Sequence, residues 1–263
     1  MTYLVEDIEI LNDGVNITLK DDLKTYNYKV HAVAFANYYV TIGKRINNEF
    51  LSNLLEESKF YFMKDQIIKK LKIKDYSRGQ IIEFLNDKMD EYMIDRMIKD
   101  LENNNYINDY NYLKNVFNKA NSKLKGKLFI INYLKDKYID EKLLASFFLN
   151  FDEKNLAEKL VKTELNKLKN KYPKQVIINK ILYKLNYNGF SELIVQDIID
   201  DLQYIKSNDN DELIIKECTK LVNKYSKKLK NNELERKVIE TLVAKGYNYK
   251  SVKSVIEGMI KND

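Results

Sequence analysis

The chain has very few of the side chains on which metal sites, disulfides and most active sites depend. Its 263 residues include one cysteine, Cys218, one histidine, His31, one proline and no tryptophan. One cysteine rules out an internal disulfide and a cysteine metal cluster, and one histidine rules out a two-histidine metal site. Cys218 falls at helical spacing among apolar residues, which favours a buried thiol over a nucleophile.

Motifs of nucleotide-dependent enzymes are missing as well. The sequence contains no GxxxxGK[ST] loop and no glycine-rich dinucleotide fingerprint. An active site needs several reactive groups that converge in one pocket, and the sequence offers few. We therefore expect a protein that is not an enzyme, with no catalytic residue, no metal and no cofactor. His31 stands at the start of a predicted helix, where we expect a capping or a surface role.

Signals for export or membrane insertion are absent too. No stretch approaches the ~18 apolar residues of a membrane-spanning helix. The N-terminal residues, MTYLVEDIEI, lack the charged-then-apolar order of a signal peptide. We expect a cytoplasmic protein without membrane contact.

Helix breakers are scarce, which predicts a mainly α fold: there are seven glycines and one proline in the whole chain. Only residues 3–30 have strand character. Alternating apolar residues flank Asn12-Asp13-Gly14, a hairpin turn signal, and a third alternation ends at Val30. We expect a small N-terminal β-hairpin or three-stranded element, then a helix over 32–40 and two amphipathic helices over 48–72.

A pattern of two adjacent apolar residues followed by leucine recurs four times in the remaining chain. The leucines are Leu85, Leu134, Leu185 and Leu242, and they are 49, 51 and 57 residues apart. Ten, 13, 14 and 17 residues after each of the last three, another apolar stripe follows, and the first copy fits with one residue fewer. Each copy predicts helix, turn and helix, and the intervals supply a third helix.

We therefore expect tandem three-helix repeats that form an elongated curved rod. The predicted boundaries are 1–72 for the N-terminal sheet and helices, 73–121, 122–172 and 173–228 for three repeats, and 229–263 for a partial C-terminal repeat.

Glycines mark the predicted turns of the later repeats. Gly189 and Gly246 stand where the first helix of a repeat should end, a usual place for a left-handed residue, and an aromatic residue follows each. We expect these aromatics to pack into the joint. Met89 and Tyr138 occupy the same position in the first two copies, so those turns must reach their geometry in another way.

Charge and tyrosine are distributed unevenly. Residues 121–176 contain 13 basic and seven acidic residues, a net charge of +6, which would suit a polyanionic partner. Lysine between aromatic residues can also bind single-stranded nucleic acid by stacking. However, many of the 20 tyrosines, such as Tyr133, Tyr183 and Tyr247, lie in or beside apolar stripes, so we predict core or joint positions and no stacking surface.

Several segments together resemble the RecX family of bacterial regulatory proteins. These segments are YSRGQIIEFLNDK (76–88), LENNNYINDYNYLKNVF (101–117), LKGKLFIINYLKDKYID (124–140), LNYNGF (185–190), LVAKGY (242–247) and FANYYVTIGKRI (35–46). The last is similar to the N-terminal extension of long Gram-positive members. Gly126 matches a family glycine at a repeat opening, and we count it with Gly189 and Gly246 as structural. Two turns depart from the pattern by lacking glycine, and the family's frequent arginine is largely lysine here.

The resemblance implies a non-enzymatic protein that binds RecA and lies in the groove of its filament on single-stranded DNA. It would modulate, most simply inhibit, the recombinase, ATPase and coprotease activities of RecA in recombination, DNA repair and the SOS response. We expect a monomer that meets single-stranded DNA through the filament or weakly alone. Arg78 is a candidate contact from the family match, and Lys123, Lys125 and Lys127 are candidates as a cluster; Asp109 is expected to be a helix cap.

A different class of function stays open, because a helix–turn–helix unit is also typical of DNA-binding transcriptional regulators. That alternative predicts a recognition helix with base-reading side chains at its start. The second helices here begin SELIVQDI and NYKSVKSV and share no such set, which counts against it.

Overall fold

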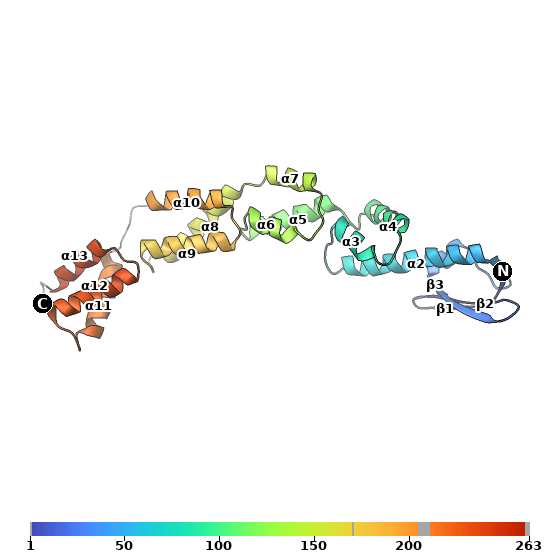
Figure 1. Cartoon of the computed structure of the whole chain (residues 1–263), viewed down its shortest axis with the longest axis horizontal. Helices are drawn as coiled ribbons and strands as arrows, with labels where there is room; N and C mark the ends of the chain where they lie inside the picture. The colour runs from blue at the N-terminus through green and yellow to red at the C-terminus, as the bar shows by residue number, and fades with distance from the viewer. Residues whose placement is uncertain (1, 170, 205–210, 261–263) are drawn as a thin grey trace. The chain divides into compact units, whose positions relative to one another are not determined.

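The computed structural model describes residues 2–169, 171–204 and 211–260, and within them the chain forms thirteen α-helices and four β-strands (Figure 1). It divides into two compact units. The first comprises Met1–Tyr112 and Lys137–Ile139, and the second comprises Leu113–Asp136 and Asp140–Asp263. The predicted mainly α fold with a small N-terminal sheet is confirmed.

The first unit opens with an antiparallel sheet in the order β3-β2-β1-β4. Its strands are β1 (Thr2–Leu11), β2 (Gly14–Lys20), β3 (Thr25–Val30) and β4 (Arg45–Asn47). The first three are the predicted ones, and the alternating Val15, Ile17 and Leu19 point into the core. The fourth strand was not predicted, because three residues are too short to show an alternation.

Two helices follow the sheet, α1 (Ala32–Asn37) and α2 (Asn48–Leu71). Of the two roles expected for His31, the structure shows the cap: it is the N-cap of α1, and its Nδ1 accepts a hydrogen bond of 3.1 Å from Val33 N. The prediction of two helices over 48–72 was wrong, since α2 is one continuous helix of 24 residues. The polar interval that suggested a break contains no glycine or proline, so the helix continues through it.

Helix α2 contributes to two cores of the first unit. Its N-terminal half, through Leu51 and Leu54, packs with the inward face of the sheet. Its C-terminal half, through Phe60 and Ile67, packs with α3 (Arg78–Leu85) and α4 (Glu91–Asn103). Helix α5 (Asp109–Ser122) begins in the first unit and continues in the second.

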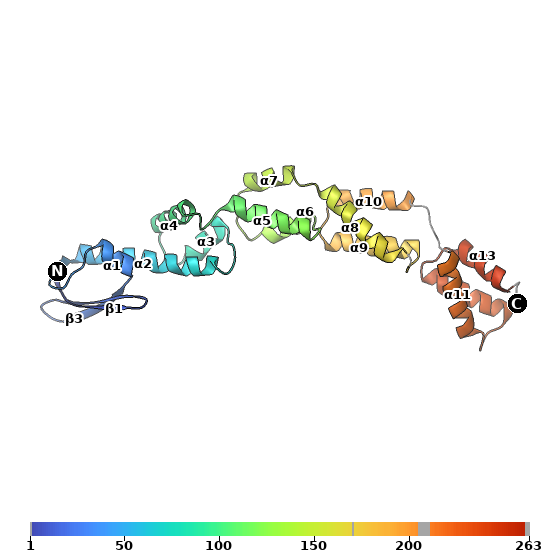
Figure 2. The same ribbon diagram turned by 180° about the vertical axis from the view of Figure 1, so that it is seen from behind.

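The second unit is helical throughout its described residues. Its helices are α6 (Lys127–Leu134), α7 (Glu141–Leu149), α8 (Glu153–Leu168), α9 (Lys174–Tyr187), α10 (Glu192–Tyr204), α11 (Asp211–Tyr225), α12 (Asn231–Ala244) and α13 (Tyr249–Ile260). Figure 2 shows α8, α9 and α10 side by side, and they enclose one core, whereas α11, α12 and α13 enclose another.

The four repeated leucines occupy equivalent places, since each lies buried at the end of the first helix of its copy or near it. The stripes that follow them are buried in α4, α10 and α13, for example at Ile98, Ile198 and Ile256. The stripe after Leu134 differs, because no residue of α7 is buried. Phe190 and Tyr247 are buried beside their turns, as predicted.

Two tyrosine predictions were wrong. Tyr133 and Tyr183 are 49% and 71% exposed, although buried apolar residues lie within two positions of each in the sequence. Successive helical residues are rotated by about 100°, so a neighbour of a buried residue can face solvent. In α9 the buried face is formed by Ile177, Ile181 and Leu185, and Tyr183 lies on the opposite side.

Candidate binding surface at the α5–α6 turn

The turn between α5 and α6 is held against the turn between α9 and α10. The backbone N–H of Gly126, the N-cap of α6, donates a hydrogen bond of 2.9 Å to the carbonyl of Asn188. Leu128 N donates another, also of 2.9 Å, to the carbonyl of Gly189. These two bonds use N–H groups at the start of α6 that have no partner inside the helix.

Both turns depend on glycine for this contact. A Cβ atom added to Gly126 would lie 2.5 Å from Phe190 N, and one added to Gly189 would lie 2.5 Å from Phe129 N. Gly189 also has a φ of +73°, which side chains other than glycine's rarely allow. Gly126, by contrast, has an extended backbone with φ of −85°, so its need for glycine is one of space alone.

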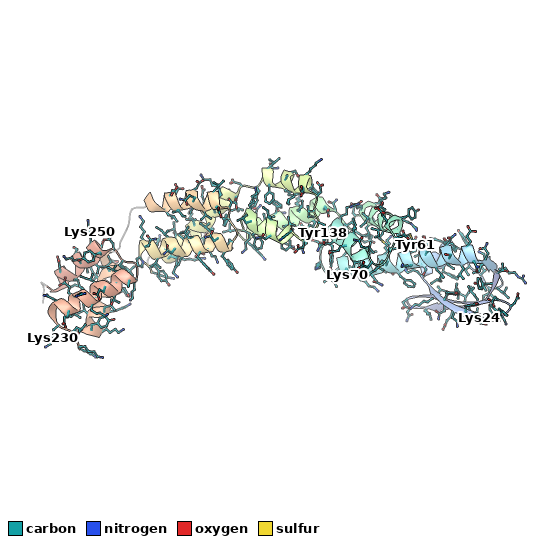
Figure 3. The ribbon with its side chains drawn as sticks, viewed as in Figure 1. Lys24, Tyr61, Lys70, Tyr138, Lys230 and Lys250 are labelled. Carbon is teal, nitrogen blue, oxygen red and sulfur yellow. The ribbon has the colours of Figure 1, made fainter. Side chains whose placement is uncertain are left out.

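The same joint recurs at the other repeats. Gly246, with φ of +90°, lies so close to the start of α9 that a Cβ would meet Val176 Cγ2 at 2.9 Å. In the first unit, Tyr138 lies against the start of α3: the Ser77 hydroxyl donates to the Lys137 carbonyl, and a Cβ on Gly79 would be 2.7 Å from the Tyr138 carbonyl oxygen (Figure 3). In each joint, the turn after the repeated leucine contacts the start of the first helix of the preceding copy.

Tyr138 shows how a turn without glycine reaches this geometry. It adopts a left-handed backbone with φ of +52°, at a cost of about 1–2 kcal/mol for a residue with a side chain. Its hydroxyl donates a hydrogen bond of 2.8 Å to Glu83 Oε1 on α3, which fixes the side chain beside the joint.

The structure places the three candidate lysines on this α5–α6 turn. Lys125 is half-buried, and its Nζ donates to Asn188 Oδ1 at 2.7 Å and lies 4.7 Å and 5.1 Å from the ring centroids of Phe129 and Tyr187. Lys123 and Lys127 are exposed. Burial lowers the pKa of Lys125, and the positive charges of Lys184 and Lys123 lower it further.

Lys184 and Tyr187 therefore belong to the same surface, and sequence reasoning did not assign them to it. They lie about 60 residues from Lys125, and only the glycine joint brings α9 beside this turn. The recurrence of a Leu-x-x-x-Gly-aromatic turn was the available signal, but it did not show which helix the turn contacts.

Arg78, the fourth candidate, belongs to the first unit and already has partners. Its Nε lies 3.3 Å from Glu102 Oε1, and its backbone N–H donates to Asp109 Oδ1 at 2.7 Å. Asp109 thus caps α3, as expected. Burial raises the pKa of the Asp109 carboxyl, the Arg78 N–H and guanidinium oppose this, and Glu102 adds to it.

Comparison with known proteins identifies the family. No family model matches the chain. The regulatory protein RecX of Streptococcus agalactiae is 28% identical over 235 residues, which cover 88% of this chain and 91% of the relative. The regulatory protein RecX of Streptococcus mutans is 27% identical over 217 residues, covering 80% and 84%. The chain is a RecX family protein.

A solved structure supports the fold of this RecX family member. A crystal structure of a regulatory protein RecX matches with a TM-score of 0.55 and 21% identity, over 76% of this chain and 99% of that one. The family resemblance seen in the sequence is confirmed by the two streptococcal relatives.

Other kinds of site find little support in this RecX family member. In the parts of the chain that the structure describes, no three His, Cys, Asp or Glu side chains gather as a metal site would require. The same residues include no helix whose length and apolar character would let it cross a membrane. Cys218 is fully buried, and burial raises the pKa of its thiol to about 11, which leaves almost no thiolate at neutral pH.

Proposed function

We propose that this chain is a non-enzymatic regulator that acts in the cytoplasm, binds RecA and the RecA–single-stranded DNA filament, and lowers the filament's recombinase, ATPase and coprotease activities. Such a protein would act in recombination, DNA repair and the SOS response. The observation that carries the proposal is the similarity to proteins named regulatory protein RecX over 84–91% of their own length.

The α5–α6 turn is the surface on which we place filament binding. Lys123, Lys125 and Lys127 concentrate three positive charges on five residues, and the charges that shift the pKa of Lys125 are those of Lys184 and Lys123, which are also positive. A nucleoprotein filament presents DNA phosphates, to which lysine binds with release of counterions. Arg78 is a weaker candidate, because its guanidinium is paired with Glu102.

The first test measures the effect of the purified chain on RecA. RecA filaments on single-stranded DNA are mixed with increasing amounts of the chain, and ATP hydrolysis and strand exchange are followed. We expect both rates to fall as the chain approaches stoichiometric amounts. Unchanged rates, together with sequence-selective binding to duplex DNA, would instead support the transcriptional regulator.

The second test removes the lysine cluster. The variant Lys123→Ala/Lys125→Ala/Lys127→Ala should bind the filament more weakly, and the slope of log K against log salt should fall by about 2, at roughly 0.7 per lost charge for a single strand.

A matched control removes three lysines from another turn, Lys227, Lys228 and Lys230, which are exposed beyond the end of α11 (Lys230 is labelled in Figure 3). This control variant changes the net charge by the same amount, and its slope of log K against log salt should equal that of the unchanged chain within experimental error. Equal losses in the two variants would mean that overall charge, and no particular turn, governs binding.

A further inference from the structure

Two segments that lack acidic residues meet at the joint between α6 and α9. Residues 113–135 and 165–191 each contain six lysines and no aspartate or glutamate. The bonds from Gly126 and Leu128 to the α9–α10 turn join the two segments. Glu153 reaches this joint, but its carboxylate accepts from the backbone N–H groups of Lys127 and Ser191 and is held there. Of the twelve lysines in these segments, Lys125 and Lys184 lie beside the joint, since their Nζ atoms stand 5.1 Å and 5.8 Å from the ring centroid of Tyr187.

Exposed aromatic rings lie within this basic surface. Tyr183 and Tyr187 stand one turn apart on α9 and are 71% and 65% exposed. Their rings are nearly parallel, with centroids 6.3 Å apart and an angle of 17° between the planes. Because so much of each ring is open to solvent, the pair offers flat surface on which a planar group can stack.

Lysines alternate with these rings. Lys184 lies beside Tyr187, with Nζ 5.8 Å from the ring centroid, and Lys125 approaches the same ring from the α5–α6 turn at 5.1 Å. One turn earlier on α9, Lys180 stands 4.7 Å from the ring of Tyr172. The surface thus repeats a cation and a ring along α9.

This alternation fits one class of ligand better than others. A single-stranded DNA offers phosphates to the lysines and open base faces to the rings. In a duplex the base faces are covered by their neighbours, so only the phosphates would be used. An acidic peptide would likewise leave the tyrosine rings without a stacking partner.

We propose that α9 and the α5–α6 turn form a binding site for single-stranded DNA in which bases stack on Tyr183 and Tyr187 and phosphates contact Lys125, Lys180 and Lys184. The role of this site in the cell rests on the proposed function, because the RecA filament would supply the single-stranded DNA. Binding of a free strand needs no RecA and is tested separately.

The experiment measures fluorescence anisotropy of a labelled short oligothymidylate with the full chain and with Tyr183→Leu/Tyr187→Leu. Leucine keeps helix propensity and removes the rings. Each stacked base contributes about 5- to 100-fold in affinity, so we expect the variant to bind at least about 10-fold more weakly. Tyr183→Phe/Tyr187→Phe, which keeps the rings, should bind like the unchanged chain.

The control Tyr92→Leu/Tyr249→Leu removes two exposed tyrosines from α4 and α13 and should bind normally. Circular dichroism checks that all variants keep their helices. The site is overturned if the leucine variant binds the oligothymidylate as the unchanged chain does, if the phenylalanine variant loses as much affinity, or if a duplex of the same length suffers an equal loss.

Inhibition of RecA ATPase by the same variants separates the two proposals. Ring-dependent binding of the oligothymidylate by a chain without any effect on RecA would contradict the proposed function and leave the site standing. Inhibition of RecA without ring-dependent binding of the oligothymidylate would contradict the proposed DNA site and leave the proposed function standing.

Discussion

Replacing Gly126 with alanine should open the joint between α6 and the α9–α10 turn. The added Cβ would lie 2.5 Å from Phe190 N and would also press on the Gly189 carbonyl. These are backbone atoms, so they cannot move aside as a flexible side chain can. The backbone angles of Gly126, φ −85° and ψ 179°, suit alanine, so the whole effect comes from the lack of space.

The magnitude follows from what the joint contains. Overpacking typically costs about 1–3 kcal/mol. If the joint separates to relieve it, the bonds from Gly126 N to Asn188 O and from Leu128 N to Gly189 O are lost, each worth about 0.5–1.5 kcal/mol. Either response therefore costs about 1–3 kcal/mol in the free energy of unfolding of the part that contains the joint, which lowers its melting temperature by roughly 2–12 °C.

Calorimetry and hydrogen exchange measure this directly. The Leu128 amide should exchange much faster in Gly126→Ala, because its acceptor belongs to the displaced turn. Gly258→Ala is the control: among the described residues, nothing outside its own stretch of helix lies within 4 Å of the added Cβ, and alanine in a helix should stabilise α13 by about 0.5–1 kcal/mol. If Gly126→Ala has the same melting temperature as the unchanged chain and its Leu128 amide exchanges at the same rate, the joint is not packed as described.

Two further predictions concern titratable groups, the partly buried Asp109 carboxyl and the buried Cys218 thiol. Because the folded-state pKa of Asp109 is raised, this carboxyl favours the folded chain below its unfolded pKa, and that contribution is lost as pH rises through the folded pKa. The variant Asp109→Asn keeps a side-chain oxygen that accepts from Arg78 N but cannot ionise. In urea unfolding, its free energy of unfolding should therefore rise relative to that of the unchanged chain from about pH 4 upward. A difference between the two chains that does not change with pH would contradict the claim that burial raises the Asp109 pKa. Cys218, with a thiol pKa of about 11, should resist iodoacetamide in the native chain at about pH 8 and react once urea unfolds it, whereas rapid native labelling would show that α11 opens readily.

The sequence predicted more of the fold than of the surface. Strand alternation, the Gly14 turn and the repeated leucines each depend on neighbours close in the chain, and the structure bears them out. The errors came where short segments are ambiguous. A polar interval in α2 resembled a break, and β4 is too short to be recognised without the strand on which it pairs.

The candidate site, too, was predicted from the sequence only in part. Lys123, Lys125 and Lys127 are visible as a cluster, because they occupy five consecutive residues. The exposure of Tyr183 and the approach of Tyr187 to Lys125 were not predicted, because side-chain exposure depends on which face of a helix its neighbours cover.

By itself the sequence determined where the helices before Gly189 and Gly246 end, since glycine enters the left-handed region readily. The same sequence determined which face of α10 and α13 is buried, since apolar spacing defines a helix face. It also determined the family, through the order of its repeats. Only the tertiary structure decided that each turn contacts the start of the preceding copy's first helix. That choice depends on whether two backbones can approach within hydrogen-bonding distance, and Gly126 and Gly189 permit it because neither carries a Cβ.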